Sequence, residues 1–172
     1  MANTFELIAS STVGAGGAAS IDFTSIPSTY TDLCVKICSR LTSAAYTQSL
    51  TMQFNGSTSG YSSKNLRGNG SAASSVSDVY GTDEIYLGEL PAASATSNTF
   101  GNGDIYIPNY AGSAYKSVSC DIVTEDNQTL AYAYLTAGLW SNTSAITSIK
   151  LIPNAGNFVQ YSTAYLYGVK NA

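Results

Sequence analysis

The feature of this chain that most restricts its fold is the alternation of apolar and polar side chains with a period of two. The clearest example spans residues 33–40, where Leu33, Val35 and Ile37 share one parity and Lys36 and Arg40 share the other. Successive side chains of a β-strand point to opposite faces, so one face of this segment is expected to meet a core and the other water. Helical periodicity is almost absent, which predicts an all-β protein.

Two further segments show the same pattern. From Ser49 to Phe54, the inward side chains are predicted to be Leu50, Met52 and Phe54, and from Ser117 to Val123 they are Val118, Cys120 and Ile122. Other segments of strand-like composition are Phe5 to Ser10, Ala19 to Phe23, Glu84 to Leu90, Gly103 to Pro108, Thr129 to Trp140, Ile146 to Ile152 and Val159 to Lys170. Together these segments predict about ten strands.

Residues that favour turns separate these segments at intervals of about 10 to 15 residues. Examples are Asn55-Gly56, the glycines from Gly14 to Gly17, and Glu125-Asp126-Asn127. Short strands at this spacing, without helical segments between them, predict an antiparallel β-sandwich of jelly-roll-like form. The length of 172 residues fits a single domain, residues 1–172, that can bury a core without metals or disulfides.

Two stretches lack a clear alternation and are predicted to be long surface loops. They run from Tyr61 to Val79, which is rich in Ser, Gly and Asn, and from Leu90 to Thr99. Loops of that length in a compact domain are often functional or ordered by a neighbour. We expect neighbouring subunits to order them, which makes them the predicted contact regions.

The composition limits the possible partners. Only 10% of residues are charged, the net charge is −4, and Ser and Thr fill 43 of the 172 positions. No basic patch exists that could neutralise phosphates, so nucleic acid is not an expected partner. No apolar run is long enough to span a membrane, and the first residues show no secretory signal, so synthesis in a cytoplasm is expected.

The thirteen tyrosines allow two interpretations, because Tyr offers a large apolar ring with a polar tip. One group, Tyr132 and Tyr134, is predicted to share a strand face with Leu130, Thr136 and Trp140. A second group, Tyr161, Tyr165 and Tyr167, shares one parity in the last strand. These faces could pack within the domain or within a trimer, or they could form a stacked-aromatic sugar site.

The sequence gives little basis for catalysis. It has no histidine, and the five lysines are expected at solvent-facing strand positions or in loops, which disfavours a Ser–Lys pair. The carboxylates that could act in pairs are Asp83, Glu84, Glu89, Asp121, Glu125 and Asp126. Adjacent acids on a strand point to opposite faces, and the last two fall at a predicted turn.

No calcium, zinc, nucleotide or dinucleotide motif is present. Cys34 and Cys38 lie too far apart along one strand for a disulfide and are predicted to be semi-buried thiols. We therefore predict no catalytic, cofactor-binding or metal-binding residue, and the chain is not expected to be an enzyme.

Several segments resemble small virion proteins of tailed phages, common among aquatic and cyanobacterial phages. They are residues 105–113 (IYIPNYAGS), 136–141 (TAGLWS), 145–158 (AITSIKLIPNAGNF) and 164–171 (AYLYGVKN). The opening segments 5–13 (FELIASSTV) and 21–33 (IDFTSIPSTYTDL) resemble the same group. The resemblance carries no catalytic residue and implies a jelly-roll-like sandwich, trimeric, that decorates a capsid.

Three functional hypotheses follow. The first is a capsid decoration (cement) protein that binds the major capsid protein as a homotrimer on the virion surface and stabilises the shell. The second is a tail-associated or fibre-tip module that binds host-surface glycan. The third is another virion part, such as a baseplate or adaptor subunit.

Overall fold

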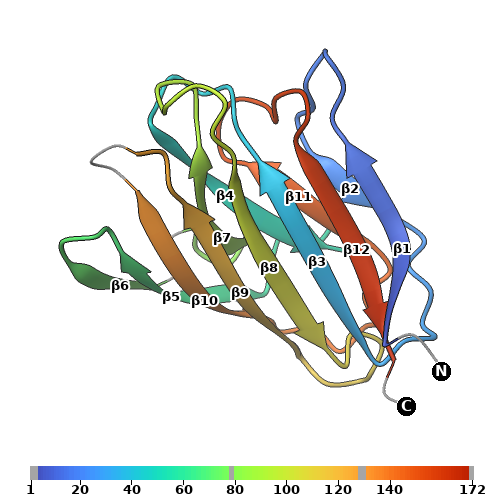
Figure 1. Ribbon diagram of the computed structural model, residues 1–172. Coiled ribbons are helices and arrows are strands. Elements are labelled where there is room, and N and C mark those ends of the chain that lie inside the picture. The colour runs from blue at the N-terminus through green and yellow to red at the C-terminus, as the bar shows by residue number, and fades with distance from the viewer. Residues whose placement is uncertain (1–3, 78–79, 128–130, 171–172) are drawn as a thin grey trace.

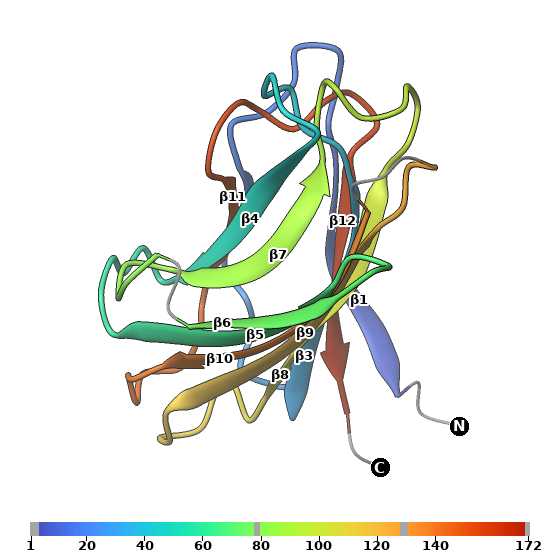
Figure 2. The same ribbon diagram turned by 90° about the vertical axis from the view of Figure 1, so that its left-hand side faces the viewer.

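The fold consists of two antiparallel β-sheets of unequal width that face each other (Figures 1 and 2). The structure is a computed structural model that describes residues 4–77, 80–127 and 131–170, and in this part of the chain it has twelve strands and no helix. Eight strands form the large sheet in the order β1-β12-β3-β8-β9-β10-β5-β6, and four form the small sheet in the order β2-β11-β4-β7.

The strand bounds are β1 Phe5–Thr12, β2 Ile21–Phe23, β3 Asp32–Ser39, β4 Thr47–Phe54, β5 Tyr61–Gly68, β6 Ala73–Ser77, β7 Ile85–Pro91, β8 Gly101–Pro108, β9 Lys116–Thr124, β10 Tyr132–Trp140, β11 Ile149–Pro153 and β12 Thr163–Val169. The large sheet twists strongly, so that β5 and β6 run across the direction of β1 and β12 in Figure 2. The prediction of an antiparallel β-sandwich is confirmed, and the three segments with the clearest alternation are strands β3, β4 and β9.

The core lies between the two sheets and is built by the predicted inward residues. Leu33, Val35 and Ile37 of β3 are buried, and so are the inward residues predicted for β4 and β9. The buried hydrophobic side chains form one continuous cluster. At one end of this cluster the rings of Phe54, Tyr61 and Trp140 contact one another, with centroids 5.6–6.3 Å apart.

The expected surface loop from Tyr61 to Val79 is wrong, because residues 61–77 form the hairpin β5–β6, while Val79 lies outside the described residues. The inward positions of β5 are Tyr61, Ser63 and Asn65, and all three are buried. Two of these three buried side chains are polar. The strand therefore alternates in burial but not in hydropathy, and the sequence pattern did not reveal it. The Asn65 side chain donates to Thr136 Oγ1 at 2.5 Å, which satisfies a polar group inside the core.

The second expected loop, Leu90 to Thr99, continues β7 to Pro91 and then leaves the sheet. This segment was expected to be ordered by neighbouring subunits, but Arg40 of the same chain holds it through hydrogen bonds. Arg40 itself was expected on a solvent-facing side of its strand. The Arg40 side chain is nearly buried, and its guanidinium donates to the carbonyls of Ala95 and Thr96 at 3.0 and 2.7 Å and to Thr99. β3 ends at Ser39, so the alternation that would point Arg40 outward stops one residue earlier.

A second cation also departs from expectation. Lys116 was expected in a loop or at a solvent-facing strand position, but it is fully buried at the start of β9. Its ammonium donates to the carbonyls of Gly112 and Ala114 at 2.6 and 2.5 Å and to Thr143 at 3.4 Å. These bonds tie together the turns before β9 and after β10, which is a structural role for the charge.

We predict that Arg40→Met lowers the free energy of unfolding by about 2–4 kcal/mol, because the buried carbonyl of Ala95 and the partly buried carbonyls of Thr96 and Thr99 lose a charged donor. Urea denaturation followed by circular dichroism measures the change. Arg67→Met is the matched control, since Arg67 is partly exposed, donates to the exposed Ser74 hydroxyl and lies over the Tyr132 ring at 5.5 Å from its centroid. Its cost is expected to be about 1 kcal/mol or less. Equal costs for the two variants would show that Arg40 does not hold the loop.

Candidate functional site

The most unusual surface of the molecule is the outer face of the large sheet, the face turned away from the small sheet. Among the described residues, eleven large hydrophobic side chains are exposed, and seven of them lie on this face. They are Phe5, Leu7, Leu66, Tyr106, Val123, Leu135 and Tyr165. Small proteins seldom expose so many apolar side chains together unless the surface binds something.

Strand pairing arranges this face in rows, because directly paired residues of neighbouring strands lie side by side. The central row runs across all eight strands as Ser10, Tyr165, Lys36, Asp104, Asp121, Leu135, Leu66 and Ser75. The rows on either side run as Leu7, Tyr167, Cys34, Tyr106, Ser119, Ala137, Lys64 and Ser77, and as Thr12, Thr163, Cys38, Asn102, Val123, Ala133, Gly68 and Ala73. The rows divide the face into two parts of different chemistry.

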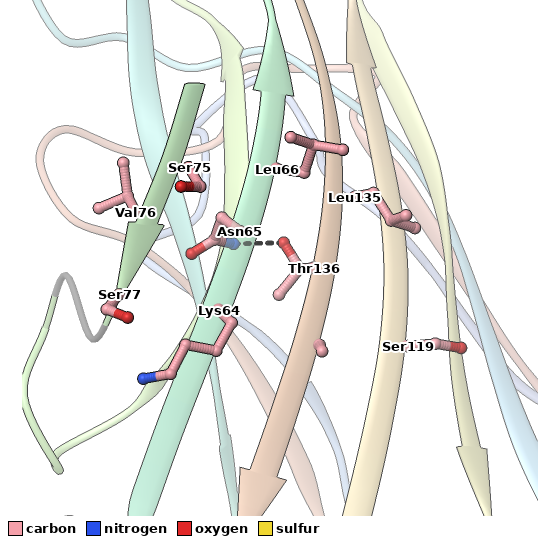
Figure 3. A pocket seen from close by; sticks show the side chains of 10 residues that line it. Lys64, Asn65, Leu66, Ser75, Val76, Ser77, Ser119, Leu135 and Thr136 are labelled. Carbon is pink, nitrogen blue, oxygen red and sulfur yellow. Dashed lines mark hydrogen bonds between the residues drawn. The ribbon is translucent and has the colours of Figure 1, made fainter. Parts of the chain in front are cut away.

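The apolar half, which we define as Leu66, Val123, Ala133, Leu135 and Ala137, lies on β5, β9 and β10. Leu66 and Leu135 are direct cross-strand partners and are 53% and 59% exposed. Figure 3 shows them on neighbouring strands beside a broad open hollow of about 730 Å³ that reaches β6. The dashed line in Figure 3 marks the hydrogen bond from Asn65 to Thr136, which lies on the opposite, inner side of the same two strands.

The tyrosine half, which we define as Lys36, Asp104, Tyr106, Tyr165 and Tyr167, lies on β3, β8 and β12. Lys36 and Asp104 are cross-strand partners and form an ion pair of 2.5 Å between half-exposed side chains. An exposed pair of this kind contributes little stability, but it fixes the positions of a donor and an acceptor.

The ring of Tyr106 is held in place by its hydroxyl, which donates to Asp32 Oδ2 at 2.5 Å. The same carboxylate accepts the Asn109 amide at 2.8 Å. Between Tyr106 and Tyr167 lies Cys34, which points outward but is only 5% exposed. The burial predicted for Cys34 is therefore found, on the outer face rather than in the core, whereas the same prediction for Cys38 is wrong because that thiol is exposed.

The two tyrosine groups of the sequence occupy different places. Tyr134 and Trp140 are buried in the core, so this part of β10 packs inside the domain, as one interpretation predicted. Tyr132 is half-buried beside Tyr134, and Leu130 lies outside the described residues. In the last group, Tyr165 is exposed and Tyr167 half-buried on the outer face, and Tyr161 is exposed in the connection before β12.

The carboxylates considered for catalysis are dispersed. Glu84 and Glu89 accept hydrogen bonds from Thr51 and Thr47, next to the small sheet. Asp83 lies before β7, and Glu125 and Asp126 follow β9 in the predicted turn, where Glu125 accepts the Asn127 amide at 2.7 Å. Asp121 lies on the outer face directly opposite Asp104. The sequence alone did not predict that Asp104 and Asp121 are neighbours, because they belong to different strands.

Within the described residues, no three His, Cys, Asp or Glu side chains lie close enough together to hold a metal ion. The same residues contain no helix long and apolar enough to cross a membrane. A comparison with known proteins found no matching family model, curated protein or solved structure. The outer face must therefore be interpreted from its own chemistry.

We predict that the pKa of Tyr106 is about 12, because its hydroxyl donates to Asp32 and ionisation would place two negative charges side by side. The bonded neutral phenol stabilises the fold fully below about pH 10 and this contribution is lost as the pH rises through about 12. Titration of the tyrosine Cζ resonances by NMR measures the pKa. In Asp32→Asn the value should fall toward 10, and an unchanged value would contradict this explanation.

Proposed function

We propose that this protein is a non-catalytic structural component of a tailed-phage virion, a capsid decoration protein that packs against the major capsid protein and stabilises the shell. The observation that supports the proposal most directly is the outer face, where exposed Leu66, Leu135 and Val123 form an apolar surface on a rigid sheet. The resemblance of several sequence segments to small phage virion proteins supports the same role.

The apolar half suits contact with a folded protein. Its two leucines are more than half exposed, and the neighbouring Ala133, Ala137 and Ser119 are small, so another surface can approach the sheet closely. Burying such side chains is favourable by about 25 cal/mol for each Å² of apolar area removed from water. A protein with few charges gains little from electrostatic steering, so shape and apolar contact would dominate its association.

Assembly of copies into the proposed homotrimer has support from one edge of the large sheet. β6 reads Ala-Ser-Ser-Val-Ser, is exposed along its whole length, and carries no charge or proline. Such an edge leaves backbone groups available for pairing with another strand. The opposite edge, β1, is less suited to pairing with another strand. Its register is irregular at Ile8, and it carries the Glu6–Lys170 ion pair.

The decisive experiment locates the protein on the virions of the phage that encodes it, by cryo-electron microscopy. Regular density over the capsid lattice is the expected result. Density at the tail tip alone would replace the decoration role with a tail-associated one, and absence from the particle would refute a virion role altogether.

We predict that the double variant Leu66→Asp, Leu135→Asp reduces binding to capsids by at least about tenfold, because it places two charges in an apolar contact. Co-sedimentation of purified protein with capsids that lack it measures the binding. The free energy of unfolding should fall by about 1–2 kcal/mol, since the two new carboxylates face each other and Asp121 across the strands. Circular dichroism must therefore confirm that the variant is folded in the binding assay.

Tyr115→Asp is the control, because Tyr115 is 59% exposed but precedes β9 and lies outside the apolar half. Its binding should match that of the wild type. If the double variant also binds normally, the apolar half is not the contact surface.

A further inference from the structure

The tyrosine half contains a second hollow, separate from the apolar half. It measures about 370 Å³ and lies over β3, β8 and β12. Its lining includes Lys36, Cys38, Asn102, Asp104, Tyr165 and Tyr167. The exposed ring of Tyr165 and the half-buried ring of Tyr167 lie here beside charged and amide groups, in contrast to the aliphatic surface on the other half of the sheet.

Two aromatic rings, one in the lining of this hollow and one beside it, are held by their own chain before any ligand arrives. Tyr167 packs edge to face against Phe5, with ring centroids 6.3 Å apart and an interplanar angle of 75°. Tyr106, one strand beyond Cys34 in the same row, is fixed by its hydrogen bond to Asp32. Tyr165 lies beside Lys36 and is 37% exposed. Rings that are already ordered lose little rotamer entropy when a ligand stacks on them.

The polar groups at the hollow define the charge of a suitable ligand. Lys36 and Asp104 neutralise each other, and Asp121 lies opposite Asp104 as a further carboxylate. The hollow thus offers an ammonium donor, carboxylate acceptors and the Asn102 amide at fixed positions, with an excess of negative charge. An anionic ligand is disfavoured both here and by the net charge of −4.

We propose that this hollow binds a neutral saccharide. A pyranose ring has an apolar C–H face that can stack on Tyr165 or Tyr167, and vicinal hydroxyls that can bridge Lys36 and Asp104. This combination matches ordered rings beside paired donors and acceptors better than it matches an aliphatic or an anionic ligand. The site is independent of the virion role, because it uses different strands from the apolar half.

Affinity electrophoresis tests this proposal with the whole chain. The acidic protein migrates through native gels that contain dextran, yeast α-mannan, soluble β-glucan or, as the anionic comparison, alginate. We expect at least one neutral polysaccharide to slow migration about twofold or more, and alginate to have no effect. Failure of all three neutral polysaccharides, or retardation by alginate alone, would overturn the proposal.

Variants assign the binding to this hollow. Tyr165→Ala should weaken retardation at least about fivefold in apparent affinity, whereas Tyr165→Phe, which keeps the ring, should retain it. Tyr115→Ala is the matched control for loss of an exposed tyrosine elsewhere. Circular dichroism confirms folding of each variant, and full binding by folded Tyr165→Ala would exclude this site.

A second measurement uses the exposed thiol in the lining. Saturating amounts of the polysaccharide that binds should slow alkylation of Cys38 by iodoacetamide several-fold, as measured by mass spectrometry, while Cys34 and Cys120 are already buried. An unchanged Cys38 rate would place the saccharide elsewhere. Two crossed measurements separate this proposal from the virion role. Tyr165→Ala should bind capsids normally, and the double variant Leu66→Asp, Leu135→Asp should bind the saccharide normally.

Discussion

The unequal width of the two sheets is the constraint on which the rest of the structure depends. Eight strands must bury one face, but only four strands cover them, and the described residues contain no helix that covers the opposite face. The core is complete because β7 lies over β9 and β10, where Gly88 brings its backbone close to Ile122 and Tyr134. The same arrangement leaves the whole outer face bare, so its side chains are free to make contacts outside the domain.

The strands were predictable wherever burial coincided with hydropathy. In each of β3, β4 and β9 three consecutive inward positions are apolar, so the period of two is visible without any structure. β5 follows the same geometry with Tyr61, Ser63 and Asn65 inward, and there the signal fails. Hydrogen bonds donated by the Asn65 amide nitrogen offset part of the cost of its burial, although its carbonyl oxygen has no partner among the described residues. No local pattern in the sequence could reveal a partner as distant as Thr136.

The candidate surfaces were less predictable than the strands, because they depend on pairing between distant segments. Sequence parity correctly grouped Tyr165 with Tyr167, but it could not bring Tyr106 or Asp104 beside them, since β8 lies about sixty residues earlier. Arg40 shows the same limit in another form. The alternation in β3 predicted that Arg40 faces solvent. Because the strand ends at Ser39, the Arg40 side chain instead points toward the loop after β7 and donates to the Ala95 carbonyl.

The core and the outer face cannot vary independently, because one register determines both. A slip of one residue in the pairing of β3 with β8 and β12 would move Leu33, Val35 and Ile37 out of the core and bring Lys36 into it, at a prohibitive cost. Burial of those three side chains therefore keeps Lys36 and Cys34 on the outer face, where the observed pairing places Lys36 beside Asp104 and Cys34 between two tyrosines. The hydrophobic core thus determines which groups face outward, and the backbone pairing of β3 with β8 and β12 determines which of them are neighbours.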